Sequence, residues 1–136
     1  LIETPQDASE RVACLKAASR ADIYKLGNLY AVFARVHSHE AAACRGLVKL
    51  GADIAVVAAE KRDESRISSR GRQGIAEQGI DLAEIFKVLG EILDGTGGGH
   101  GLAGSANGKN SKAREKAFAF ILHALEGKAG RASKLD

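Results

Sequence analysis

The chain has 136 residues, of which 45% are hydrophobic and 27% are charged. These values are typical of one globular domain with a buried core, and they exclude a disordered or low-complexity chain. No apolar run reaches the roughly 20 residues of a membrane-spanning helix, and the N-terminus lacks the layout of a signal peptide. We therefore expect a cytoplasmic protein that makes no membrane contact.

Charge and cysteine content add two constraints. The formal net charge is +3, and the segment from Lys109 onward holds seven Lys or Arg against three Asp or Glu. Such a basic segment can attract phosphate backbones, although a solvated helix face is the commoner explanation. Cys14 and Cys44 lack a metal-ligand spacing, and we interpret both as small buried thiols in a reducing compartment.

The first predicted element is a helix that ends near Arg20. Thr4 is a suitable capping residue, and Pro5 suits the first helical position. The predicted apolar face of this helix consists of Ala8, Val12 and Leu15. Because the sequence starts at Leu1, directly before this helix signal, we expect the chain to be a piece of a longer polypeptide.

A strand, a helix and a second strand follow. Residues 29–36 and 53–59 are rich in β-branched and aliphatic side chains, which predicts two strands buried on both faces. Ser38 can cap a helix that runs to Leu50, with Gly51 as its end. The three elements form a right-handed crossover unit with parallel strands. Residues 65–69 alternate well enough to predict a strand that returns antiparallel.

The strongest helical pattern begins at Asp81. Glu84 lies three residues after it, so the pair forms a capping box, and the helix is predicted to end on Gly95. Its apolar stripe comprises Leu82, Ile85, Phe86, Leu89, Ile92 and Leu93. Residues 71–79 are expected to form an exposed loop, with a helical turn as the alternative. Residues 102–107 are expected to form a strand, and residues from about Ser111 a last helix. That helix buries Phe118, Ile121, Leu122 and Leu125.

The order of these elements predicts an α/β fold. We expect a mixed, mainly parallel sheet of four to five strands flanked by helices. Residues 21–126 form the domain itself, residues 1–20 form the N-terminal helix, and residues 127–136 form a flexible basic tail.

Residues 95–101 combine five glycines with one histidine. Glycine at this density indicates backbone that takes unusual angles or approaches a ligand closely. Successive N–H groups of a loop can form a concave nest for phosphate or carboxylate oxygens, and His100 adds a donor. A flexible hairpin or linker is the competing interpretation. Residues 99–104 also match a dinucleotide fingerprint, but they follow a helix instead of a strand, so we reject that function.

The glycine-rich stretch resembles a known family signature. Residues 97–108 are similar to the Gly-Gly-Gly-His signature of the DHHA1 domain, the C-terminal substrate-binding domain of DHH-family phosphoesterases. The likeness is greatest to RecJ-like single-strand exonucleases and small phosphodiesterases. Gly71 stands where many relatives carry Ser, and Gly104 with Ser105 replaces an Ala-Gly pair. Further segments in that domain's order and spacing are residues 37–41, 51–55, 66–70 and 79–85.

The resemblance implies that hydrolysis and substrate binding lie in separate domains. In the family, a separate N-terminal DHH domain holds manganese and performs hydrolysis, and it is missing here. Residues 1–20 would link to it. This chain would therefore contain no catalytic residue, no metal ligand and no cofactor, and its role would be to bind the substrate. The resemblance assigns substrate or phosphate binding to Gly97, Gly98, Gly99 and His100, and it places Arg70 at a motif arginine. Ser68 is a further candidate for a hydrogen bond to the ligand.

Three functions stay open. The first is substrate binding for a manganese-dependent phosphoesterase, with single-stranded nucleic acid or a short oligonucleotide as partner beside the missing DHH domain. The second is the related tRNA-binding C-terminal module of alanyl-tRNA synthetases; the strand motif at residues 66–70 and the helix at Asp81 favour the first over it. The third is a scaffold with an empty glycine loop. Homodimer formation is also left open.

Overall fold

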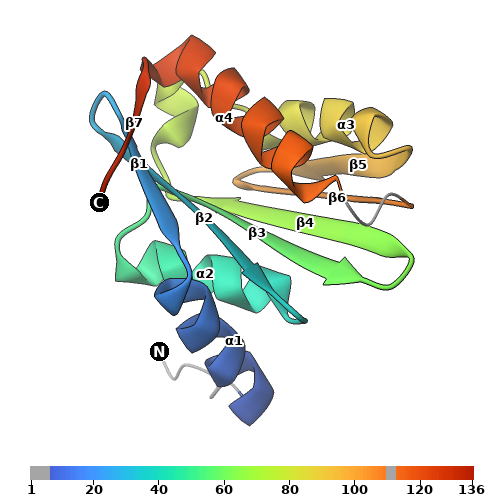
Figure 1. The fold of residues 1–136 in the computed structure, drawn as a ribbon. Coiled ribbons are helices and arrows are strands. Elements are labelled where there is room, and N and C mark those ends of the chain that lie inside the picture. The colour runs from blue at the N-terminus through green and yellow to red at the C-terminus, as the bar shows by residue number, and fades with distance from the viewer. Residues whose placement is uncertain (1–6, 110–112) are drawn as a thin grey trace.

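The computed structural model of the chain describes residues 7–109 and 113–136. Helices and strands alternate around one sheet (Figure 1). In chain order they are α1 (Ala8–Ser19), β1 (Asp22–Leu26), β2 (Leu29–Val36), α2 (Glu40–Leu50), β3 (Ile54–Lys61), β4 (Glu64–Gly71), the 3-10 turn η1 (Ile75–Gln78), α3 (Leu82–Ile92), β5 (Gly95–His100), β6 (Ala103–Gly108), α4 (Arg114–Ala129) and β7 (Ala132–Lys134).

The sheet is mixed, as predicted, but it has seven described strands in the order β5-β6-β4-β3-β2-β1-β7. The predictions of four to five strands and of a mainly parallel sheet are wrong. Among the described strands, β2 and β3 form the one parallel pair, joined through α2. The other pairs are antiparallel because hairpins connect most neighbours, and a hairpin reverses the chain direction.

Two helices cover each face of the sheet, but they cover it unequally. Figure 1 shows α1 and α2 below the sheet and α3 and α4 above it. The upper core is the larger and extends from Leu26 in β1 to Ala106 in β6. The lower core is confined to α1, α2, β2 and β3, with residues such as Val32 and Val57. The lower faces of β6 and β5 therefore lie outside both cores.

The central strands match the prediction closely. β2 and β3 are buried on both faces, with alternate side chains in the upper and lower cores. Arg35 interrupts the apolar run of β2 and is exposed. Long apolar runs predict such strands reliably because both faces of a covered strand must be apolar.

Three strands were missed, each for a physical reason. β1 is a short hairpin strand, and its two-residue turn at Gly27-Asn28 is a signal that could have found it. β5 consists largely of glycine, which disfavours strands, so it was predicted as a loop. β7 lies in the segment predicted to be a flexible tail. It pairs with β1 because the chain returns from α4 along that edge, where the Leu135 N–H donates to the Ile23 carbonyl at 2.8 Å.

The helix starts differ from the prediction at two places. Thr4 and Pro5 lie outside the described residues, and the N-cap of α1 is Asp7, which accepts from the Glu10 N–H at 2.8 Å. Ser38 does not cap α2. The N-cap position belongs to His39, whose left-handed φ of 62° turns the chain sharply between β2 and the helix.

The buried face of α1 also differs from the prediction. Val12 and Leu15 are 46% and 70% exposed, and the smaller Ala13 and Ala17 are buried instead. Small side chains face α2 because the two helices lie close together: a Cβ added at Gly46 of α2 would come within 2.8 Å of the Cys14 sulfur.

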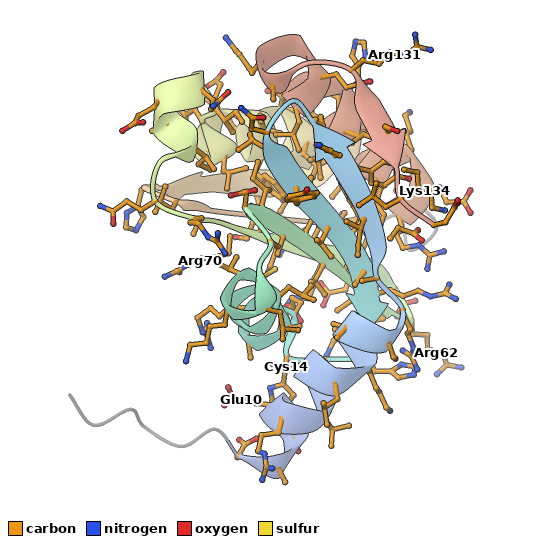
Figure 2. The ribbon with its side chains drawn as sticks, turned by 90° about the vertical axis from the view of Figure 1, so that its left-hand side faces the viewer. Glu10, Cys14, Arg62, Arg70, Arg131 and Lys134 are labelled. Carbon is orange, nitrogen blue, oxygen red and sulfur yellow. The ribbon has the colours of Figure 1, made fainter. Side chains whose placement is uncertain are left out.

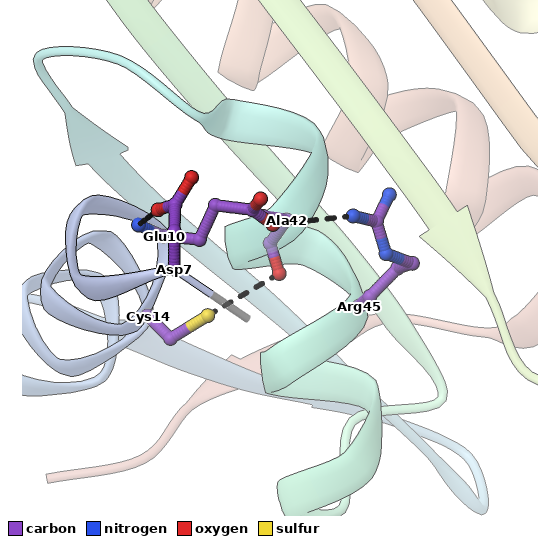
Figure 3. Close-up of polar contacts among 5 residues, drawn as sticks. All are labelled: Asp7, Glu10, Cys14, Ala42 and Arg45. Atoms are coloured by element: carbon purple, nitrogen blue, oxygen red, sulfur yellow. Dashed lines mark hydrogen bonds and ion pairs between the residues drawn. The ribbon is translucent and has the colours of Figure 1, made fainter. Parts of the chain in front are cut away.

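Two polar contacts reinforce this helix pair. The Cys14 thiol donates to the Ala42 carbonyl at 3.3 Å, and Arg45 lies 3.8 Å from Glu10 (Figure 3). The N-terminal helix is thus packed on the domain. No helix in the described part of the chain is both long and apolar enough to cross a membrane.

Candidate nucleic-acid or phosphate site

A cleft of about 600 Å³ lies on the lower face of the sheet, over β4, β6 and β5. One wall is the face of α2 that carries Glu40, Ala41, Cys44 and Arg45, and the floor is the three strands themselves. The cleft exists because α2 packs on β3 and β4 but does not extend over the last two strands, β6 and β5. An uncovered sheet face beside a helix is a common position for a ligand.

The strand register arranges the floor in three rows. Side chains of one face alternate along each strand, so residues paired across β4, β6 and β5 point the same way. The rows, each written in the order β4, β6, β5, are Arg70–Ala103–His100, Ser68–Ser105–Gly98 and Arg66–Asn107–Thr96. Four of the six predicted residues thus share this face, from strands that are distant in sequence: Ser68, Arg70, Gly98 and His100.

The first row places a guanidinium and an imidazole on either side of a methyl group. Arg70 and His100 both pair with Ala103, so their backbones are roughly 10 Å apart, or two strand spacings. Both side chains are exposed, and neither has an ion pair among the described residues. Figure 2 places Arg70 on the α2 side of the sheet. This row can offer two donors to one anion.

The second row is open at its centre. Nothing lies within 4 Å of a Cβ added at Gly98, so the absence of a side chain here leaves space above the floor. Ser68 and Ser105 contribute hydroxyl groups that both donate and accept hydrogen bonds. A ligand over Gly98 could therefore approach the backbone closely.

The third row is more nearly neutral. The Arg66 guanidinium lies 3.6 Å from the Glu40 carboxylate of α2, so its charge is partly compensated. The Thr96 hydroxyl donates to the Asn107 side-chain carbonyl at 2.8 Å, and this hydrogen bond orients the Asn107 amide group. The cleft therefore has a cationic end at Arg70 and a neutral, hydrogen-bonding end at Asn107.

Cys44 lines the wall but is not a reactive group. Its thiol donates to the Ser68 carbonyl at 3.3 Å, and burial raises the pKa of Cys44 to about 12. The thiol therefore stays protonated at neutral pH, and the thiolate is the form that attacks or binds metal. Cys44 thus ties α2 to β4 and fixes the width of the cleft.

The glycines of β5 have two different roles. A Cβ at Gly97 would overlap the Phe86 carbonyl oxygen of α3, and a Cβ at Gly90 would overlap the backbone of β5 at Gly97. Two glycines thus let α3 pack directly on the strand from above. Gly98 alternates with Gly97 and faces the cleft below. The prediction of a loop with an N–H nest is wrong, because this stretch is an extended edge strand.

The structure separates the predicted site residues into two groups. Gly97 and Gly99 point toward the α3 side and reach the cleft only with their backbones, whereas the other four face it. Sequence reasoning missed the polar partners Arg66, Ser105, Asn107 and Thr96. For Ser105 and Asn107 the signal was the alternation along residues 103–108, which places every second side chain on the cleft face once that stretch is paired with β4.

The cleft carries donors but no metal-binding cluster. Among the described residues, no three His, Cys, Asp or Glu side chains come together closely enough to hold a metal ion. No aromatic ring other than the His100 imidazole lines the cleft as described. The arrangement can therefore bind an anion and hydrogen-bond to polar groups, while base stacking contributes little.

The comparisons with known proteins agree with this architecture. The family model of the DHHA1 domain matches residues 28–127. An uncharacterized protein of Methanocaldococcus jannaschii is 36% identical over 127 residues, which cover 90% of this chain and 38% of that protein. The chain thus spans about two fifths of the length of the curated relative that it matches.

Solved structures share the fold at low sequence identity. The C-Ala domain of alanyl-tRNA synthetase from Aquifex aeolicus superposes with a TM-score of 0.61 and 17% identity, over 80% of this chain and 98% of that domain. A pGpG-specific phosphodiesterase from Vibrio cholerae superposes with a TM-score of 0.57 and 12% identity, over 88% of this chain and 39% of that enzyme. The DHH domain of a member of the s1p family of ribosomal proteins gives the same TM-score at 15% identity, over 86% of this chain and 30% of that protein.

Proposed function

The chain belongs to the DHHA1 domain family, and from this premise we propose that it is the substrate-binding domain of a larger phosphoesterase. The ligand is single-stranded nucleic acid or a short oligonucleotide, held in the cleft by its phosphate groups. The observation that carries the proposal is the row Arg70–Ala103–His100, in which two donors flank one small side chain on an open sheet face.

The chemistry of the cleft supports phosphate as the group recognised. A guanidinium matches two phosphate oxygens in a bidentate way, and Arg70 has no carboxylate partner among the described residues that would compete. The Ser68 and Ser105 hydroxyls lie in the adjacent row and suit the remaining phosphate or sugar oxygens. The absence of side-chain atoms above Gly98 provides room for the backbone of the ligand.

The hydrolytic step belongs to another part of the parent protein in this proposal. The described residues of this chain do not fit a manganese site, since no group of three potential ligands occurs among them. The relative from M. jannaschii is much longer than the matched segment, which leaves room for a DHH domain. The pGpG-specific phosphodiesterase from Vibrio cholerae, which shares the fold, is also longer than this chain. We therefore assign manganese and hydrolysis to that domain, in a RecJ-like exonuclease or small phosphodiesterase.

Fluorescence anisotropy of a labelled single-stranded oligonucleotide tests this proposal. We expect a dissociation constant on the order of 10⁻⁴ to 10⁻⁶ M that weakens as salt is added, because backbone contacts release counterions. The double variant Arg70→Gln with His100→Ala should weaken binding by at least about tenfold, since each group makes a charge-assisted hydrogen bond.

The matched control removes charge outside the cleft. Arg131 lies between α4 and β7 (Figure 2), and its substitution Arg131→Gln should change the affinity for the oligonucleotide by less than about twofold. Equal affinity of the double variant and the control would refute the site. If a tRNA binds tightly to the unaltered protein and the double variant binds it with the same affinity, the result would favour the tRNA-binding alternative instead.

A further inference from the structure

Three arginines line the cleft, and two of them are paired with carboxylates of α1 or α2. Arg66 of β4 lies 3.6 Å from Glu40, and Arg45 of α2 lies 3.8 Å from Glu10. Arg70 has no ion pair among the residues that the structure describes. The positive charge available to a ligand is therefore concentrated at one of the three guanidinium groups.

Glu40 is the acidic residue in the lining of the cleft. It is the first residue of α2, where the helix dipole favours a negative charge. Its side chain is 12% exposed, whereas that of Arg66 is 47% exposed. A carboxylate this close to the Arg66 guanidinium weakens the attraction of that group for another anion, because the carboxylate repels the anion.

The paired and the unpaired arginine of β4 lie at opposite ends of the cleft floor. Arg66 and Arg70 are four residues apart in this strand, which separates their backbones by roughly 13 Å. Both side chains are on the cleft face, since alternate residues of a strand point the same way. The partners of Arg66 in its cross-strand row, Asn107 and Thr96, are uncharged. A phosphate is therefore favoured at the Arg70 end.

We propose that Glu40 determines how many terminal phosphates the cleft accepts. It restricts phosphate to the Arg70 end, so that the Arg66 end receives the nucleoside of the same ligand. This inference rests on the proposed function, because it concerns the ligand of the same site. The Asn107 amide and the Thr96 hydroxyl suit a nucleoside, since they can hydrogen-bond to sugar hydroxyls or to a base edge. A phosphate at that end would meet the Glu40 carboxylate, and the repulsion would select against it.

Isothermal titration calorimetry with dinucleotides that differ in their terminal phosphates tests the inference. One ligand carries a phosphate at both ends, and two references carry it at the 5′ end or at the 3′ end only. In the unaltered protein, the doubly phosphorylated ligand should bind within about twofold of the tighter reference, because the second phosphate gains no free cation.

Removal of the Glu40 charge should change this preference. Glu40→Gln should make the doubly phosphorylated ligand bind at least about fivefold more tightly than the tighter reference, because the Arg66 guanidinium becomes available. The slope of log affinity against log salt should steepen by about 0.7 for this ligand, which is the contribution of one phosphate contact on a single strand. An unchanged preference in Glu40→Gln would overturn the inference.

Two variants identify the charge that matters. Glu91→Gln removes an exposed acid of α3 outside the lining of the cleft, and the preference should stay within about twofold. Glu40→Gln combined with Arg66→Gln should lose the gain, because the guanidinium that Glu40 would release is absent. A gain that persists in this double variant, or that Glu91→Gln also produces, would overturn the inference.

Arg66→Gln alone gives a result that does not depend on the folding of Glu40→Gln. It should leave the affinity for a nucleoside monophosphate within about twofold, because the phosphate lies at Arg70. A loss of about tenfold or more would make Arg66 a phosphate ligand and overturn the inference.

The same experiments separate this inference from the proposed function. If the monophosphate binds through Arg70 and His100 while Glu40→Gln changes no preference, the inference fails and the proposed function stands. If the unaltered protein binds neither the monophosphate nor any of the dinucleotides, both fail.

Discussion

Gly97 and Gly98 are adjacent in β5, face opposite sides of the sheet and have different structural roles. Gly97 lies under α3, where the Phe86 carbonyl occupies the position that a Cβ would take. Gly98 lies over the cleft, where no atom is within 4 Å of such a Cβ. One residue type therefore serves helix packing at one position and ligand access at the next.

The same substitution should therefore have different effects at the two positions. Gly97→Ala should lower the free energy of unfolding by about 1–3 kcal/mol, because the added methyl group forces α3 and β5 apart. Gly98→Ala should leave stability within about 0.5 kcal/mol and weaken oligonucleotide binding, because the methyl group enters the cleft. Urea denaturation and anisotropy on both variants provide the measurement. A destabilising Gly98→Ala or a neutral Gly97→Ala would contradict the assigned roles.

At this scale the sequence predicted the cleft only in part. The family resemblance pointed to Arg70, Gly98 and His100, and Ser68 was a separate candidate; these four residues do share one face. It could not separate Gly97 from Gly98, since their difference depends on the strand alternation of a stretch too rich in glycine to be recognised as a strand. It also missed Asn107, because the cross-strand register that places it in the cleft involves residues far apart in the chain.

Helix α3 supports the cleft from behind. Its N-cap is Asp81, whose carboxylate accepts from the Glu84 N–H at 3.3 Å. It packs on β5 and β6 through Phe86, Gly90 and the backbone around them. Its position therefore holds the two outer strands of the cleft floor flat against the upper core.

Loss of the cap should weaken this support measurably. Asp81→Ala should lower the free energy of unfolding by about 1 kcal/mol, because the first-turn N–H group loses its acceptor. Asp81→Asn is the matched control and should retain most of the stability, since Asn caps helices about as well as Asp. Thermal unfolding followed by circular dichroism measures both. An equal loss in the two variants would show that the charge of Asp81, and not its capping bond, matters.

Elements were predictable where a local signal exists. The capping box and wide apolar stripe predicted α3, and uninterrupted apolar runs predicted β2 and β3. β1 and β7 are short and lie toward one edge of the sheet, so little apolar sequence marks them. Their pairing depends on where α4 returns the chain, which no local pattern encodes.

Over the whole molecule, function follows from unequal coverage of the sheet. The upper face is covered from β1 to β5, whereas below the sheet α1 packs on β2 and α2 on β3 and β4 (Figure 1). The uncovered lower face of the last strands becomes the cleft floor, and its polar residues stand where a covered strand would be apolar. Arg70 then marks the cationic end of this surface for a phosphate group.

The most direct test of this account is a map of amide resonances during titration with a nucleoside monophosphate at low and moderate salt. We predict shifts centred on Ser68, Gly98, His100 and Ser105, which face the cleft, and weaker shifts as salt rises. No shifts at these positions at millimolar ligand, or shifts confined to residues outside the cleft, would contradict the claim that this sheet face binds phosphate.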